Sequence, residues 1–174
     1  MRMSRTPLFA LLAALFWAAP ASAQFSNRSL GLTVGYMDID DADRLDNGIP
    51  IGLMGSLYIE NGFEAVAHFD VMILREQIAS GNKQVVGIAP SIGIRYLFSE
   101  EQIRPYAGLD LSFLLTFRDA GVKSYFGLGP NLGIDFFVSS SVSLGVRAQY
   151  NLYLTLNAPV QNSIAGQFVA ATYF

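Results

Sequence analysis

Along most of this chain, apolar residues occupy every second position, and small or polar residues occupy the positions between them. A period of two is the period of a β-strand, because successive side chains of a strand point to opposite faces. Leu30, Leu32 and Val34, for example, alternate with Gly31 and Thr33. The alternation predicts eight strand segments of about ten residues each, within 30–36, 49–60, 63–73, 86–98, 104–115, 126–136, 142–154 and 164–174.

The polar face of these segments decides between two fold classes. A soluble β-sandwich or lipocalin-like barrel turns its apolar face to a core and a strongly polar face to water. Here the apolar faces are large, and the opposite faces hold mostly glycine, serine and asparagine with a few charges. Small inward residues suit the tight curvature of a narrow closed barrel. The sequence therefore predicts an all-β fold, a closed antiparallel eight-stranded transmembrane β-barrel, with the soluble folds as the alternative.

The predicted connections alternate in length, as in outer-membrane barrels. Asn61-Gly62 is a two-residue hairpin turn, and 99–102 and 138–141 are also short. We expect these three turns on the periplasmic side. Four longer connections are expected on the outside, at 38–48, 75–84, 117–124 and 155–162. Pro50, Pro90 and Pro130 fall inside strand segments, and we assign them to bulges or strand ends because proline cannot donate to a ladder.

The first 23 residues have the order of a secretory signal peptide. Arg2 and Arg5 precede an apolar run over 8–19, and Ala21-Ser22-Ala23 is a small-x-small cleavage site. The apolar run is too short to span a bilayer as a helix. We therefore expect a signal peptide at 1–23 and a barrel domain at 24–174.

Composition excludes several classes of function. The chain has 174 residues, a net charge of −3 and no cysteine, so it has neither a disulfide framework nor a thiolate metal site. The chain has two lysines, Lys83 and Lys123. Because it is acidic overall, it lacks the basic patch that nucleic-acid binding requires. No glycine-rich phosphate loop precedes a helix, so no nucleotide cofactor is expected.

Two segments resemble a known family. Arg104-Pro105-Tyr106-Ala107-Gly108-Leu109 is similar to a strand common in small outer-membrane barrels, with Asp110 where a glycine is usual. Phe168, Tyr173 and the terminal Phe174 resemble the C-terminal signal read by the barrel assembly machinery. The chain thus resembles the eight-stranded OmpX, OmpA-barrel and OmpW proteins of Gram-negative bacteria. The resemblance implies location in the bacterial outer membrane, contact with its lipid and lipopolysaccharide, association with other envelope proteins, and no cofactor. A periplasmic peptidoglycan-binding domain is not expected.

Charged residues on the inward faces are the candidate site. Such a lumen is only wide enough to be filled by side chains, and unpaired charges there are costly. We therefore expect an ion-pair network that plugs the barrel, with a switchable gate as the alternative. Its members are Glu64, His68, Asp70, Arg95, Arg104, Asp110, Asp135 and Arg147.

Two further features are candidate sites. Lipid A deacylases, which are also eight-stranded barrels, use a His-x-Ser pair with a nearby glutamate, whereas the only histidine here stands in His68-Phe69-Asp70. We therefore expect no catalytic residues. An acidic connection could hold a divalent cation through oxygen ligands, but its spacing does not match an EF-hand and no glutamate closes it. Its carboxylates are Asp38, Asp40, Asp41, Asp43 and Asp46.

These expectations point to a structural or interaction role in the cell envelope, as a surface or periplasmic docking member of an adhesion, motility or export system. The main alternative is a narrow OmpW-like channel for small or apolar solutes. The minor alternative is a lipid A-modifying barrel enzyme.

Overall fold

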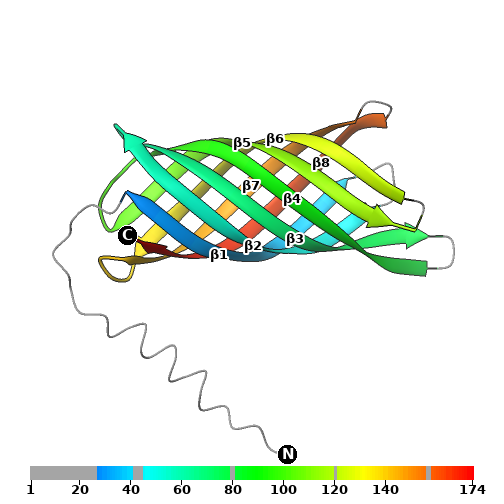
Figure 1. Cartoon of the computed structure of the whole chain (residues 1–174), viewed down its shortest axis with the longest axis horizontal. Coiled ribbons are helices and arrows are strands. Elements are labelled where there is room, and N and C mark those ends of the chain that lie inside the picture. Colours follow the sequence, from blue (N-terminus) through cyan, green and yellow to red (C-terminus); the bar gives the residue numbers. More distant parts are fainter. Residues whose placement is uncertain (1–26, 41–44, 79–80, 120, 156–157) are drawn as a thin grey trace, which may run out of the picture.

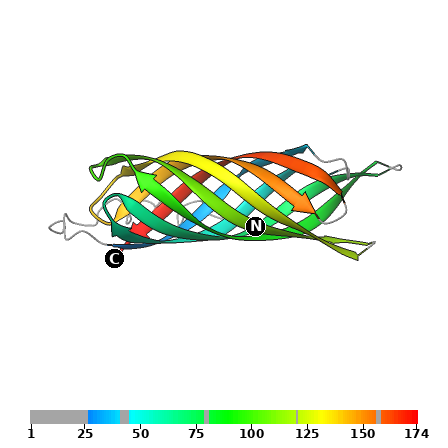
Figure 2. The same cartoon turned by 90° about the horizontal axis from the view of Figure 1, so that it is seen from above.

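The computed structural model describes residues 27–40, 45–78, 81–119, 121–155 and 158–174. The segment predicted as a signal peptide, 1–23, lies outside them. Eight antiparallel strands form one closed barrel in which each strand pairs with its neighbours in sequence and the first pairs with the last (Figures 1 and 2). The strands are β1 (Arg28–Asp40), β2 (Leu45–Glu60), β3 (Phe63–Ile78), β4 (Gly81–Leu97), β5 (Ile103–Arg118), β6 (Gly121–Phe137), β7 (Val142–Thr155) and β8 (Ala158–Tyr173). The predicted closed all-β barrel is confirmed.

One end of the barrel, which we call the terminal end, holds Arg28 and the C-terminal Phe174 (Figure 1). The short connections β2–β3, β4–β5 and β6–β7 also lie there, as the alternation of an up-and-down barrel requires. Asn61 and Gly62 form the whole β2–β3 turn, with φ angles of 51° and 83°. Positive φ at both central residues is the conformation that Asn-Gly hairpin turns favour. The predicted turn is therefore confirmed.

Replacing Gly62 with alanine should lower the free energy of unfolding by about 1–2 kcal/mol, because a side chain at positive φ is strained. An added Cβ would also lie 2.9 Å from the carbonyl oxygen of Leu97. Thermal unfolding in detergent, followed by circular dichroism, measures the loss. Gly81 also has positive φ but has open space around its Cβ position. A larger loss in Gly81→Ala than in Gly62→Ala would contradict the close approach to Leu97.

The opposite, distal end differs from the prediction. The prediction of four long connections is wrong, because the strands run through most of the residues at 38–48, 75–84, 117–124 and 155–162. In the β3–β4 hairpin, pairing continues to Ile78 opposite Gly81, and in β5–β6 to Arg118 opposite Gly121. The strands are 13 to 17 residues long. The apolar alternation fades before the strand does, because the ends of the strands carry polar side chains.

The three prolines lie in mid-strand, so their assignment to bulges or strand ends is wrong. Each is paired with one neighbouring strand, Pro50 opposite Met72 for example. On its other side the ladder skips the proline and the residue before it, and then resumes in the same register. Because proline has no N–H, each of these positions loses its backbone pairing with one neighbouring strand and keeps it with the other.

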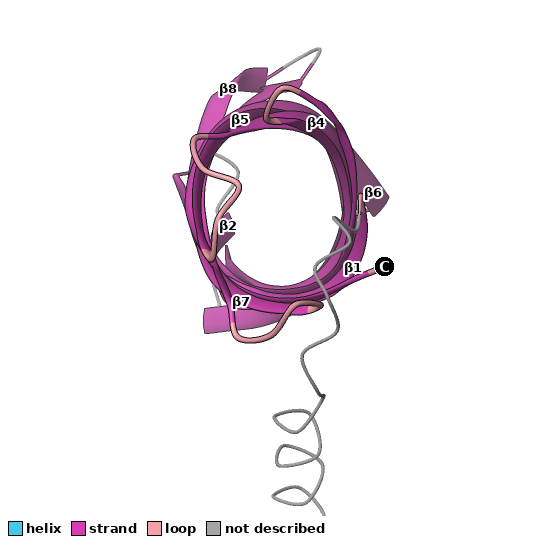
Figure 3. Ribbon diagram, turned by 90° about the vertical axis from the view of Figure 1, so that its left-hand side faces the viewer, coloured by secondary structure: helices cyan, strands magenta, loops and turns pink. Residues whose placement is uncertain are grey.

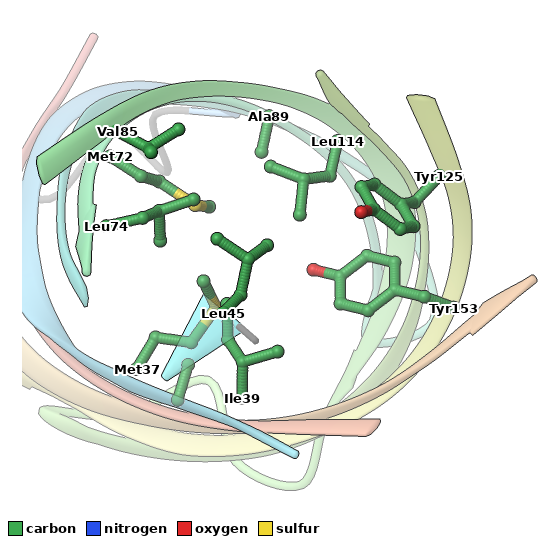
Figure 4. Packing of buried hydrophobic residues seen from close by; sticks show 11 residues of the cluster. Met37, Ile39, Leu45, Met72, Leu74, Val85, Ala89, Leu114, Tyr125 and Tyr153 are labelled. Carbon is green, nitrogen blue, oxygen red and sulfur yellow. The ribbon is translucent and has the colours of Figure 1, made fainter. Parts of the chain in front are cut away.

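The two faces of the wall differ as predicted. Large apolar side chains such as Leu32, Ile92 and Phe168 point outward and are exposed, and Figure 3 shows the closed ring of strands from which they project. Buried inward residues form two apolar clusters. The distal cluster consists of Met37, Ile39, Leu45, Met72, Leu74, Val85, Ala89, Leu114, Tyr125, Tyr153 and Ala165 (Figure 4). The terminal cluster consists of Met54, Val66, Val169, Ala171 and Tyr173, with Phe137 packed against it.

Candidate functional site

Between the two apolar clusters the lumen holds a polar layer, which we call the central layer. Its first group is built around Arg95 on β4. The Arg95 Nε donates to Oε2 of Glu64 at 2.6 Å, and Nη2 lies 3.4 Å from Oδ2 of Asp135. The guanidinium also lies over the ring of Tyr106, 4.4 Å from its centroid. Glu64 faces Arg95 directly across the β3–β4 ladder. One guanidinium thus bridges two buried carboxylates and an aromatic face.

The second group is built around Arg147 on β7. One of its terminal nitrogens donates to Asp110 Oδ2, and the other donates to Gln167 Oε1 at 3.2 Å. The latter nitrogen also lies 3.4 Å from Nδ1 of His68, which can only accept in this contact because a guanidinium has no acceptor. Gln149 adds a second donor to Asp110 at 3.1 Å. The group therefore joins four strands through one arginine.

Asp70 is the member that departs from the expected pairing. It is 7% exposed and makes no ion pair in the described part of the chain. Thr33 donates to its Oδ1 at 3.0 Å, and Gln167 approaches its Oδ2 at 3.5 Å. Neutral donors thus take the place of an arginine at this carboxylate.

Arg104 lies at the terminal end, directly across the β5–β6 ladder from Asp135 of the central layer. Its guanidinium lies over the rings of Phe137 and Tyr173, at 4.1 and 5.9 Å from the two centroids. Its Nε donates to the backbone carbonyl of Glu101 in the β4–β5 turn. Arg104 is half-buried and covers the aromatic rings of the terminal cluster.

Glycines across the ladders make room for these side chains. Gly93 is the cross-strand partner of Asp110, and Gly52 is the partner of Asp70. A Cβ at Gly93 would meet the Asp110 carboxylate and lie 2.6 Å from the carbonyl oxygen of Leu109. The large side chain therefore lies flat over the neighbouring glycine. Other pairs of this kind are Arg95 with Gly108, Asp135 with Gly145, and Tyr106 with Gly133.

Sequence reasoning missed a third inward group near the distal end. Arg118 lies 3.2 Å from the Glu76 carboxylate through Nη1 and donates to the Tyr125 hydroxyl at 3.0 Å. Glu76 points to the same inner face of β3 as Leu74, and Arg118 points to the same inner face of β5 as Leu114. The sequence pattern places both residues in connections, because the apolar alternation ends before them. At the distal end, Lys83 of β4 forms an ion pair with Asp119.

The described carboxylates of the acidic segment lie on two strands and do not share one face. Asp38 and Asp40 belong to β1 and are exposed on its outward face, whereas Asp46 lies on β2 and is half-buried. Asp41 and Asp43 lie outside the described residues. Within the described ranges, no group of three or more acidic or histidine side chains is placed to hold a metal ion.

The C-terminal residues divide between the two faces. Phe168 is 68% exposed and Phe174 is 65% exposed, whereas Tyr173 is buried inside the terminal cluster. The Phe174 N–H donates to the carbonyl of Arg28 at 3.0 Å, which ties the end of the chain to β1.

A protein-family model identifies the family to which this barrel belongs. The model of the outer membrane protein beta-barrel domain matches residues 8–168. The chain belongs to this family. Among the described residues no helix is long and apolar enough to cross a membrane. Family membership places the protein in the bacterial outer membrane, with the outward apolar faces toward lipid.

Solved structures share the fold. Neisserial surface protein A superposes with a TM-score of 0.68 at 15% identity, covering 86% of this chain and 98% of that one. The N-terminal barrel domain of Pseudomonas aeruginosa OprF gives 0.57 at 12% identity, covering 86% and 98%. OprG of the same species gives 0.56 at 10% identity, covering 86% and 96%. The search of curated proteins found no match.

Proposed function

We propose that the protein is a structural barrel of the outer membrane whose lumen is closed, and that it acts in the envelope through its surfaces rather than through a pore. The observation that carries this proposal is the filling of the lumen at three successive levels. The distal cluster, the central layer and the terminal cluster are all built from buried side chains, with Arg95 and Arg147 holding the middle level together. An apolar constriction opposes the passage of water and ions.

An enzymatic role has little support from the environment of His68. His68 is 5% exposed, lies inside the closed wall and contacts Arg147. A lipid substrate would lie on the other side of that wall. Ser91 is its cross-strand neighbour, yet no hydrogen bond joins the two side chains in the described structure.

The proposed partners follow from the same surfaces. The outward apolar band is suited to outer-membrane lipid and lipopolysaccharide, and the exposed Phe174 at the end of β8 is suited to recognition by the barrel assembly machinery. We further propose docking to another envelope protein of an adhesion, motility or export system. A pull-down from detergent-solubilised outer membranes, compared with the same pull-down on an unrelated eight-stranded barrel, would identify that partner.

Planar bilayers containing the purified protein should show no stable open steps, because the apolar clusters close the lumen at both ends. Flotation of proteoliposomes from the same preparation controls for insertion. Uniform stepwise openings would contradict the closed barrel and would favour the narrow channel for small or apolar solutes.

A further inference from the structure

A small internal cavity of about 20 Å³ lies where the central layer meets the distal cluster. Its apolar side includes Met37 and Met72, and its polar side includes Asp70, Ser112 and Asn151. A volume of this size accommodates about one water-sized particle. The cavity is therefore a single-particle site within the lumen, with oxygen-bearing side chains along one side.

The charges around this cavity do not balance. Arg147 is the only guanidinium in its group, and it pairs with Asp110. Asp70 adds a second carboxylate, which receives donors only from the neutral side chains of Thr33 and Gln167. In the central layer as a whole, the four buried carboxylates Glu64, Asp70, Asp110 and Asp135 face the two buried guanidiniums of Arg95 and Arg147, and Asp70 is the carboxylate of the four that forms no ion pair within the described residues. An uncompensated buried charge is costly, so a positive charge beside Asp70 would stabilise the folded barrel.

The neutral lining groups have oxygen atoms with capacity to spare. Asn151 Oδ1 accepts from Gln149 at 2.9 Å and retains a second lone pair. The Ser112 hydroxyl is buried beside Tyr153, and its oxygen has two lone pairs, so one remains when it accepts from the Tyr153 hydroxyl. The cavity thus combines one unpaired carboxylate with neutral oxygens, a hard-ligand set suited to a hard cation. A divalent ion of the Ca²⁺ type usually takes six to eight oxygen ligands, more than so small a site offers.

We propose that this cavity binds one dehydrated monovalent cation of the size of Na⁺ or K⁺, with Asp70 supplying the negative charge. Because the apolar clusters close both ends, the cation enters when the barrel folds and stays when it is complete. The site stabilises the fold and is independent of whether the barrel conducts.

The test compares protein refolded into detergent in NaCl or KCl with protein refolded in choline chloride at equal ionic strength, since choline is too large for the cavity. The melting temperature should be higher in the small cations by about 5 °C. Asp70→Asn removes the charge but keeps the shape, and its melting temperature should not depend on the cation. Glu64→Gln is the matched control, because Arg95 keeps Asp135 as a partner, and it should retain the dependence.

Crystals of protein refolded in thallium(I) acetate give a second measurement that does not depend on the variants. An anomalous peak within bonding distance of the Asp70 carboxylate is expected. Equal melting temperatures of the wild type in all salts, equal loss of the dependence in Glu64→Gln and Asp70→Asn, or a cavity without anomalous signal would each overturn the proposal.

Discussion

Replacing Arg95 with alanine should lower the free energy of unfolding by about 3–5 kcal/mol, because it leaves Glu64 buried without its ion-pair partner and removes the guanidinium that Glu64 shares with Asp135. The variant also loses the guanidinium over Tyr106. Urea unfolding in detergent micelles, followed by far-ultraviolet circular dichroism, measures the change. Tryptophan fluorescence is unsuitable, since the only tryptophan, Trp17, lies in the segment predicted to be removed.

A rescue experiment separates the charge effect from lost packing. In the triple variant Arg95→Ala, Glu64→Gln, Asp135→Asn, both carboxylates become neutral, and a large part of the lost stability should return. Arg75→Ala is the control for removing an arginine, because Arg75 is exposed on the outward face of β3. An unchanged urea midpoint in Arg95→Ala would mean that the ion pairs do not hold the barrel together.

The sequence was sufficient to predict which side chains point inward. Parity along a strand is a local property, so Glu64, Asp110 and Arg147 could be placed on the inner face without knowing their neighbours. The same parity, followed a few residues further, would have placed Glu76 and Arg118 inside as well. The failure at the distal end therefore came from ending the strands where the apolar residues ended.

Pairing between side chains could not be predicted, because it depends on register and on distance across the barrel. Arg147 on β7 reaches Asp110 on β5, and the sequence gives no measure of that separation. Asp70 was expected to pair with an arginine for the same reason and does not. The two apolar clusters were also missed, because inward residues such as Met37 and Leu114 look like ordinary strand residues until closure brings them together.

The placement of glycines opposite large inward side chains also depends on register, and substitution of such a glycine should have a large effect on stability. Gly93→Ala should destabilise the barrel by about 3 kcal/mol, since overpacking a filled interior forces backbone shifts. The added Cβ would lie 2.6 Å from the carbonyl oxygen of Leu109, which cannot rotate away. It would also meet the Asp110 carboxylate and push it from Arg147. Thermal unfolding of the refolded variant in detergent measures this loss.

Gly166→Ala is the matched control, because Gly166 lies within β8 and has no atom within 4 Å of its Cβ position. Its stability should stay within about 0.5 kcal/mol of the wild type. Both variants change one glycine to alanine in a strand, so they have similar effects on the unfolded chain. The difference between them therefore reports the close approach at Gly93. Equal stabilities of the two variants would show that the wall can move apart there, and that Asp110 does not depend on a glycine across the ladder.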